Sequence, residues 1–386
     1  MNKKLIILFM ALIVTGGCIV QFVPEFNEEN PYLIVEGLIT DQKEAYQLRL
    51  SWTFPLNAPY TYNPVNGFII SVTDDEGNRY FFEDRGDGTY LSDPGAFQGV
   101  PGRKYALHIE GNSHIYESES MELMPVPPVD SVYAFREENE FYHPGKTTTG
   151  FQVYADSRDP DDLCRFFRWE FEETWEFKIP WDYSAIVNRV CWKSAASNNI
   201  NIKSTSALSE SRVSRQPILF ISTETDRLLR KYSILVKQYS LNEKEFIYWE
   251  NLKKTTEEVG GLYDIVPSSV SSNIICVDDP SQKVLGYFRV SSVATSRLFI
   301  EDVQMRFPDF YAYCPFDTIL VSNYDPIVHR NVYILREWSE IPPDVYYYIL
   351  SAKKECVDCT LSGSGVKPDY WDLPDQKTLF HSLFDE

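Results

Sequence analysis

Cysteines are the residues of this chain whose spacing comes nearest to a known chemistry. Beyond Cys18 there are six, namely Cys164, Cys191, Cys276, Cys314, Cys356 and Cys359. Cys356 and Cys359 have the spacing of redox pairs and of half a zinc site, with Cys314 and His329 as the nearest further ligands. Gly363, Gly365 and Pro368 follow the pair, which indicates a loop rather than the helix start that lowers a thiol pKa.

Structural disulfides are therefore the preferred interpretation of these six cysteines. An even number of cysteines in an oxidising compartment is typical of a disulfide framework. The sequence leaves the pairing open, and Cys356 and Cys359 could bond to each other or to Cys314.

Histidines are the next residues to consider for catalysis, and there are five: His108, His114, His143, His329 and His381. None belongs to a metalloprotease helix motif, and the sequence contains no Gly-x-Ser-x-Gly elbow, phosphate-binding loop or dinucleotide fingerprint. A triad assembled in space around a lone histidine stays open. We predict no catalytic residue, no metal and no cofactor.

Acidic clusters at 74–76, 159–162 and 278–279 could be calcium ligands or paired carboxylates of a glycosidase. All lie beside predicted turns, which favours solvated hairpin tips.

Four tryptophans, Trp169, Trp175, Trp181 and Trp192, lie within one segment of 24 residues. The polar residues around Trp175 make Trp175 and Trp181 candidates for an exposed binding surface, whereas core packing at alternating positions is the competing interpretation.

The N-terminal residues have the order of an export signal. Two lysines precede an apolar run over residues 5–14, which is too short to span a bilayer, and Thr15-Gly16-Gly17 lead to Cys18. This order resembles the lipobox of bacterial lipoproteins, although Thr15 stands where leucine is usual. The resemblance implies a diacylglyceryl thioether on Cys18 and cleavage after Gly17. An ordinary secretory signal with an incidental Cys18 is the alternative.

Charge and composition exclude some functions. The formal charge is −20, and removal of residues 1–17 with their two lysines leaves −22. Such a chain lacks the clustered cations that nucleic acid requires. Aromatic residues make up 15% of the sequence, which suits the pleated surfaces of β-sheets.

Short alternating segments predict a mainly β fold. They lie at residues 32–39, 47–52, 68–72, 79–82, 104–109, 115–118, 151–154, 166–171, 232–239, 284–290 and 297–300. The first six segments are spaced as in an immunoglobulin-like β-sandwich. One helix is expected, with Ser240 as its N-cap, Glu243 completing a capping box, and Gly260-Gly261 ending it.

Prolines between Pro125 and Pro128 predict a boundary near residue 128. The expected organisation is a signal peptide, a lipid-anchored tether, an immunoglobulin-like β-sandwich, a larger β-rich domain with a helix near 241–258, and a C-terminal disulfide-containing segment. Their bounds are 1–17, 18–31, 32–126, 130–305 and 306–386.

Four stretches carry a resemblance to the domain of unknown function 4249 (DUF4249) family. They are residues 33–41, 127–131, 232–249, and 356–360 together with 367–371. The resemblance implies a lipoprotein of the outer membrane in Bacteroidetes-type bacteria, held to the bilayer through acylated Cys18 and associated with a TonB-dependent receptor. It brings no catalytic residues. The apolar residues after Cys18 leave open whether the protein faces the periplasm or the cell surface.

We therefore expect a non-catalytic accessory or ligand-binding partner of a TonB-dependent nutrient receptor. A glycan-binding or glycan-degrading protein of the cell envelope is the alternative, and a peptide ligand or a purely structural role remains open. An acid pair facing a cleft would favour an enzyme, an aromatic platform would favour glycan binding, and an apolar surface patch would favour a protein partner.

Overall fold

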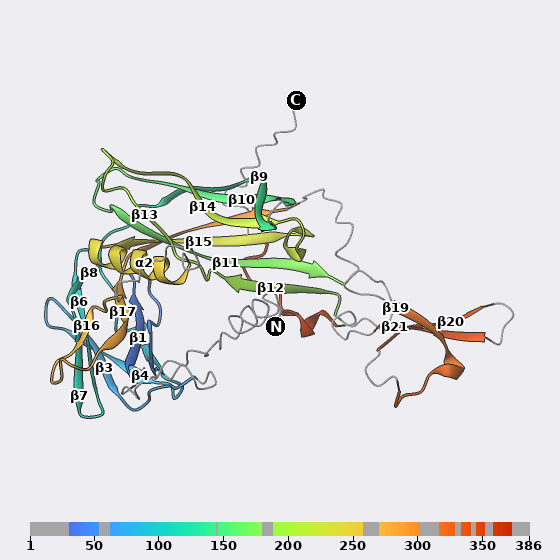
Figure 1. The fold of residues 1–386 in the computed structure, drawn as a ribbon, viewed down its shortest axis with the longest axis horizontal. Coiled ribbons are helices and arrows are strands. Elements are labelled where there is room, and N and C mark those ends of the chain that lie inside the picture. The colour runs from blue at the N-terminus through green and yellow to red at the C-terminus, as the bar shows by residue number, and fades with distance from the viewer. Residues whose placement is uncertain are drawn as a thin grey trace, which may run out of the picture.

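The computed structural model confirms a mainly β chain with one α-helix among the residues that it describes. These are residues 31–53, 62–143, 146–179, 188–257, 270–301, 316–328, 333–340, 345–351 and 358–372. Within this part of the chain, no helix has both the length and the apolar composition needed to cross a bilayer. Figure 1 shows a curled sheet at lower left, a sandwich above it and a small sheet at the right.

The curled sheet follows one hydrogen-bonded path. Its order is β16 (Ile274–Cys276), β7 (His114–Ser118), β6 (Lys104–Gly111), β3 (Ile69–Asp74), β4 (Arg79–Asp84), β5 (Thr89–Ser92), β2 (Gln47–Trp52), β1 (Leu33–Ile39) and β17 (Val284–Val290), with β8 (Met121–Glu122) beside β6. Alternate side chains, such as Leu48 and Leu50, fill its interior. These strands form a single sheet that curls almost into a barrel. They do not form the two facing sheets of the immunoglobulin-like β-sandwich predicted for residues 32–126.

Two strands of this barrel come from far along the chain. β17 pairs with β1 in parallel, so that Val35 lies opposite Gly286, and β16 pairs with β7. Both strands fall inside the 130–305 range that we had assigned to the second domain. The first domain is therefore not continuous in sequence. The chain leaves the barrel after β8 and enters the sandwich at Val129, directly after the proline-rich linker.

The sandwich contains two facing sheets. One has the order β14 (Ser211–Ser222), β10 (Lys146–Asp159) and β9 (Val129–His143). The other has the order β12 (Val190–Ala196), β11 (Phe166–Lys178), β15 (Tyr232–Leu241) and β18 (Val293–Ile300), with β13 (Asn201–Ser204) also pairing with β11. Residues such as Val153 and Trp169 form a shared core between the two sheets.

Helix α2 (Glu243–Thr256) lies where barrel and sandwich meet (Figure 1). Its N-cap is Asn242, whose side chain accepts a hydrogen bond from the Glu245 N–H, and not the expected Ser240. Gly260-Gly261 lie outside the described residues. Glu245 is 0% exposed and pairs with Arg289 of β17. Arg168 of β11 places its guanidinium 3.7 Å from the Trp249 ring centroid. Charged side chains thus join helix, barrel and sandwich.

The C-terminal part of the chain returns to the sandwich. A small sheet has the order β19 (Phe316–Leu320), β21 (Val345–Ser351) and β20 (Tyr333–Glu340). Residues 358–372, which include the 3₁₀ turn η5 (Cys359–Leu361), then run along the β12 edge of the second sandwich sheet, where Cys359 enters the core and Ser364 pairs with Trp192. Trp371 is buried against Trp192 and Phe299, and the Arg297 guanidinium lies 3.7 Å from the Tyr370 ring centroid.

Candidate functional site

One of the two candidate binding residues chosen from the sequence, Trp175, is not exposed. Trp175 is buried in the sandwich core, where the Arg227 guanidinium lies 4.7 Å from its ring centroid. The prediction for Trp175 was wrong because odd-numbered residues of β11 point between the two sheets. Trp181 and the acylation candidate Cys18 lie outside the described residues, so both stay predictions.

The cysteines divide into one disulfide and two free thiols. Cys191 on β12 bonds to Cys359 across 168 residues, which confirms these two as disulfide partners and excludes a redox or zinc pair at Cys356 and Cys359. Cys164 and Cys276 are free and buried, which corrects our expectation of disulfides there. They belong to the separate sandwich and barrel cores, so they do not meet. Cys314 and Cys356 lie outside the described residues.

The outer face of the barrel carries five exposed apolar side chains on or directly beside neighbouring strands. Opposite residues on neighbouring strands share a face, so the strand register places Phe81, Ser71, His108, Glu117 and Ile275 in one row across β4, β3, β6, β7 and β16. Phe81 is 60% exposed and Ile275 is 65% exposed. The row therefore has an apolar residue at each end and a polar centre.

A second row runs parallel to the first. Ile69 lies opposite Glu110, Glu110 lies opposite Ile115, and the Val277 N–H donates to the Ile115 carbonyl. Ile69, Ile115 and Val277 are all exposed. We call the residues of the two rows the barrel outer face. Its exposed apolar residues flank a charged centre. This composition is more typical of a protein-binding surface than of a sheet face that contacts only solvent.

The centre of the barrel outer face is a charge network around His108. Its Nε2 lies 2.7 Å from Glu110 Oε1, and its Nδ1 lies 3.0 Å from Glu117 Oε1. Arg79 is 3.7 Å from Glu110. The hydrogen bond with His108 lowers the pKa of Glu110, so this carboxyl is a poor general acid at neutral pH. A shallow pocket of about 260 Å³ adjoins the network and is lined by Thr73, Arg79, Ala106, Leu107, His108, Glu117 and Ser118.

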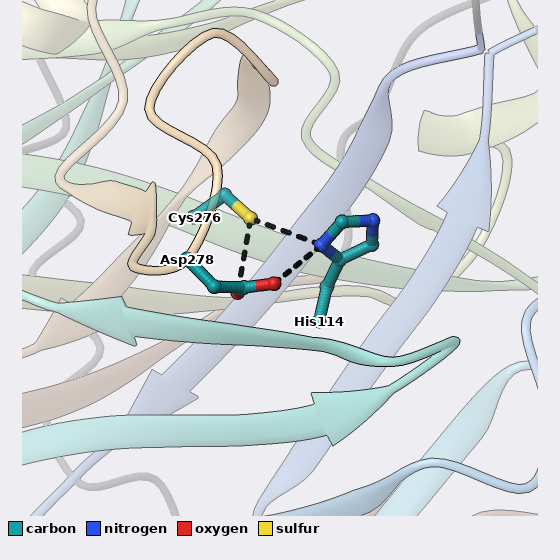
Figure 2. Close-up of side chains that lie close together, drawn as sticks. All are labelled: His114, Cys276 and Asp278. Atoms are coloured by element: carbon teal, nitrogen blue, oxygen red, sulfur yellow. Dashed lines mark hydrogen bonds and ion pairs between the residues drawn. The ribbon is translucent and has the colours of Figure 1, made fainter.

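On the inward side of the same strands, where β7 begins and β16 ends, three side chains of different chemistry converge (Figure 2). His114 Nδ1 lies 2.7 Å from Asp278 Oδ2 and 3.8 Å from Cys276 Sγ, and this sulfur lies 3.5 Å from Asp278 Oδ1. We call these residues the His–Cys–Asp cluster. Among the described residues, it is the one group of three His, Cys, Asp or Glu side chains close enough to share a metal ion.

Local structure explains how the cluster is held. His114 begins β7 directly after Asn112 and Ser113, whose positive φ angles close the tight β6–β7 hairpin. Cys276 ends β16, beside β7, and Asp278 follows it. Asp278 Oδ1 accepts a hydrogen bond from the Ile115 N–H at 2.8 Å. The carboxylate is therefore oriented by backbone as well as by His114.

Electrostatics distinguishes the three groups. The Ile115 N–H and His114 lower the pKa of Asp278 to about 2, so this carboxylate is ionised at neutral pH. Cys276 is 1% exposed, and burial together with Asp278 and Asp279 raises the pKa of its thiol. A hydrolytic relay needs the nucleophile and the acid on opposite nitrogens of the imidazole. Here sulfur and carboxylate face the same nitrogen, which is the geometry of convergent ligands.

The predicted acidic turns behave as local structure rather than as cation sites. Asp74, expected at a solvated tip, is buried instead, and its carboxylate accepts hydrogen bonds from Asn78 and Tyr80. Arg103 forms an ion pair with it at 2.9 Å. Asp159 accepts a hydrogen bond from the Cys164 N–H. Of the predicted acidic clusters, only 278–279 lies beside other ligand types in the described part of the chain.

Sequence reasoning missed the His–Cys–Asp cluster. His114 had been placed at a turn, Cys276 among the disulfide candidates and Asp278 at a hairpin tip. The local signal was the short Cys276-x-Asp278 spacing, but the histidine lies 162 residues earlier. Only the pairing of β16 with β7 brings it near.

Comparison with known proteins places the chain by sequence. A family model described as "Domain of unknown function (DUF4249)" matches residues 19–297, which is well over half of the chain. The matched region includes the barrel, helix α2 and nearly all of the sandwich. No curated protein matches the chain.

Proposed function

Because the chain belongs to the DUF4249 family, we propose that it is a non-catalytic outer-membrane lipoprotein of a Bacteroidetes-type bacterium. In this proposal it serves a TonB-dependent nutrient receptor as an accessory or ligand-binding partner. Acylated Cys18 holds it to the membrane, and residues 19–31 connect the anchor to β1. The receptor comes from the family resemblance, and the barrel outer face is the surface that would meet it.

One observation carries this proposal: five large apolar side chains are exposed on adjoining strands of a rigid sheet. Their removal from water on binding would be favourable, at roughly 25 cal/mol per Å² of apolar surface. The charged centre at His108, Glu110 and Arg79 would supply the polar contacts that fix orientation. A rigid β surface also loses little conformational entropy when it binds.

The proposal includes the absence of catalytic activity, which the surroundings of two histidines, His108 and His114, support. Both ring nitrogens of His108 are occupied by carboxylates, which leaves no nitrogen to activate a nucleophile. In the His–Cys–Asp cluster, the thiol and the carboxylate face the same nitrogen, Nδ1. Neither arrangement matches a relay for acyl transfer.

The test is purification of the full, natively anchored chain from its own membranes, followed by mass spectrometry of bound proteins. We expect a TonB-dependent receptor with the natural protein and its loss with the double variant Phe81→Glu and Ile275→Glu. Leu208→Glu is the matched control, because Leu208 is also an exposed apolar residue but lies on the sandwich. Equal receptor recovery with all three proteins, or none with the natural chain, would rule the proposal out.

Glycan binding is the second candidate, and a different surface favours it. On the solvent side of β9 and β10, the Arg215 guanidinium lies 5.6 Å from the Phe135 ring centroid and 5.1 Å from that of Tyr154. Arg215 has φ +50°, a strained backbone that often marks a functional position. Rings beside carboxylates such as Glu137, which accepts a hydrogen bond from Tyr154, suit sugar stacking.

Binding of the purified protein to an array of bacterial and host glycans tests this candidate. A specific glycan that binds the natural chain, and binds Tyr154→Ala at least about tenfold more weakly, would support it. Binding that tolerates Tyr154→Ala but fails with the Phe81→Glu and Ile275→Glu variant would move the ligand to the barrel outer face.

A further inference from the structure

The His–Cys–Asp cluster has the ligand types and the spacing of a zinc site. Zinc takes thiolate at about 2.3 Å and imidazole or carboxylate at about 2.0–2.2 Å, so tetrahedral neighbours lie about 3.3–3.6 Å apart. The sulfur lies 3.5 Å from Asp278 Oδ1 and 3.8 Å from His114 Nδ1. The His114–Asp278 contact, at 2.7 Å, has the length of a direct hydrogen bond. One ligand atom from each of the three residues lies within 4.8 Å of the other two, so small side-chain adjustments would fit a sulfur, a nitrogen and one carboxylate oxygen around one ion.

We propose that His114, Cys276 and Asp278 bind one Zn²⁺ ion, with a fourth position open to solvent. The three ligands would be a thiolate sulfur, an imidazole nitrogen and a carboxylate oxygen. Zinc binds all three types, whereas calcium and magnesium prefer oxygen ligands alone. His114 and Asp278 are partly exposed, so the ion has an entry path, while Cys276 forms the buried wall. On binding, the Cys276 thiol would release its proton to solvent, and His114 would carry its remaining proton on Nε2.

A neighbouring side chain supports the assignment independently. Tyr116 is 0% exposed, and its hydroxyl forms no hydrogen bond of normal geometry among the described residues, although the Gln282 side chain is near enough to oppose the rise of its pKa. Tyr116 lies directly opposite Cys276 in the β7–β16 register. Buried polar groups are rarely left unpaired in native proteins, and an ion or a water beside them is a common reason. A water on the open position of the zinc ion would give this part of the barrel a polar partner.

The ion would also have a structural consequence. His114 belongs to the β6–β7 hairpin, whereas Cys276 ends β16 and Asp278 lies in the segment that leads from β16 to β17. These elements lie at the seam where the curled sheet closes. A metal there would tie together residues separated by more than 160 positions and would stabilise the folded chain by preferential binding.

The experiment is metal titration of the purified mature chain, with its disulfide intact and its bound metal first removed by a chelator. We expect one equivalent of Zn²⁺, and we expect Co²⁺ in the same site to show the sulfur-to-cobalt charge-transfer absorption that reports a thiolate ligand. Loss of a group that merely orients a zinc ligand costs about 10–100-fold in affinity. Cys276→Ser, His114→Gln and Asp278→Asn should therefore each cost at least about 100-fold.

Cys164→Ser is the matched control, because Cys164 is the other buried free thiol and lies in the sandwich core. This variant should keep the affinity and the cobalt spectrum of the natural chain. His114→Gln and Asp278→Asn change partly exposed side chains, so they keep the test decisive if Cys276→Ser fails to fold. Stoichiometric zinc that survives all three variants, or no zinc above a weak acidic-surface background, would overturn the assignment.

Discussion

The side-chain amide of Asn273 is hydrogen-bonded twice to the backbone of Phe288. Asn273 Nδ2 donates to the Phe288 carbonyl at 2.8 Å, and the Phe288 N–H donates to Asn273 Oδ1 at 2.9 Å. Asn273 directly precedes β16 and Phe288 lies in β17, which are the two ends of the sheet path. The buried amide thus imitates one residue of a neighbouring strand and closes the barrel.

Removal of this amide should weaken the barrel. Asn273→Ala leaves a buried N–H and a buried carbonyl of Phe288 without partners, and each costs about 1–3 kcal/mol. We expect the free energy of unfolding to fall by about 2–4 kcal/mol, measured by urea denaturation. Asn199→Ala, at an exposed position, is the control and should change stability little. An unchanged urea midpoint for Asn273→Ala would show that the seam is closed by other contacts.

Gly286 provides a test of the parallel pairing between β1 and β17. An added β-carbon would lie 2.1 Å from the Val35 carbonyl oxygen, and the residue has φ +87°. Gly77 has nearly the same φ, +88°, but open space around it. Gly77→Ala should cost about 1–2 kcal/mol for its backbone strain alone. Gly286→Ala should cost clearly more by the same denaturation assay, and equal costs would contradict the close approach of the two strands.

The buried ion pair between Glu245 and Arg289 should make stability depend on pH when it is broken. Burial raises the pKa of Glu245 above its ordinary value, and Arg289 partly opposes this rise. Arg289→Ala should destabilise the fold by about 3–5 kcal/mol at pH 8, because the buried carboxylate loses its ion-pair partner and keeps only the weaker attraction of Arg168.

The sign of the pH dependence follows from the direction of that shift. With its cation gone, Glu245 has a still higher folded pKa, so the native state binds the proton more strongly than the unfolded chain does. Stability of Arg289→Ala should therefore be greatest at low pH and fall as pH rises through the folded pKa. Urea unfolding at pH 5 and pH 8 measures this. The double variant Glu245→Gln and Arg289→Met, which buries no charge at either position, should lose the dependence.

The Cys191–Cys359 disulfide should hold residues 358–372 against the sandwich. Its loss removes a constraint on the unfolded chain worth about 2–5 kcal/mol. The double variant Cys191→Ser and Cys359→Ser should therefore melt at a lower temperature than the natural chain, and Trp371 should become accessible to a fluorescence quencher. A thiol reductant should lower the melting temperature of the natural chain but leave that of the double variant unchanged. A reductant effect of equal size in both proteins would assign the stabilisation to another bond.

Local patterns in the sequence were enough to predict a mainly β chain and the helix at residues 243–256. Alternation of side chains along segments such as 47–52 encodes which face is buried, and this information lies within a few residues. The same is true of α2, although Asn242 caps it in place of Ser240 because both residue types suit that position. The exposure of Trp175 was predicted wrongly because both faces of β11 are largely buried. Alternation along such a strand does not indicate which of its tryptophans are exposed.

Only the tertiary structure decided the pairings that cross long stretches of chain. No local pattern states that β17 lies beside β1, that Cys191 meets Cys359, or that Glu245 is buried against Arg289. Such contacts depend on sheet register and barrel closure, which are collective properties of many strands. His114 therefore lies beside Cys276 and Asp278 only because β16 pairs with β7.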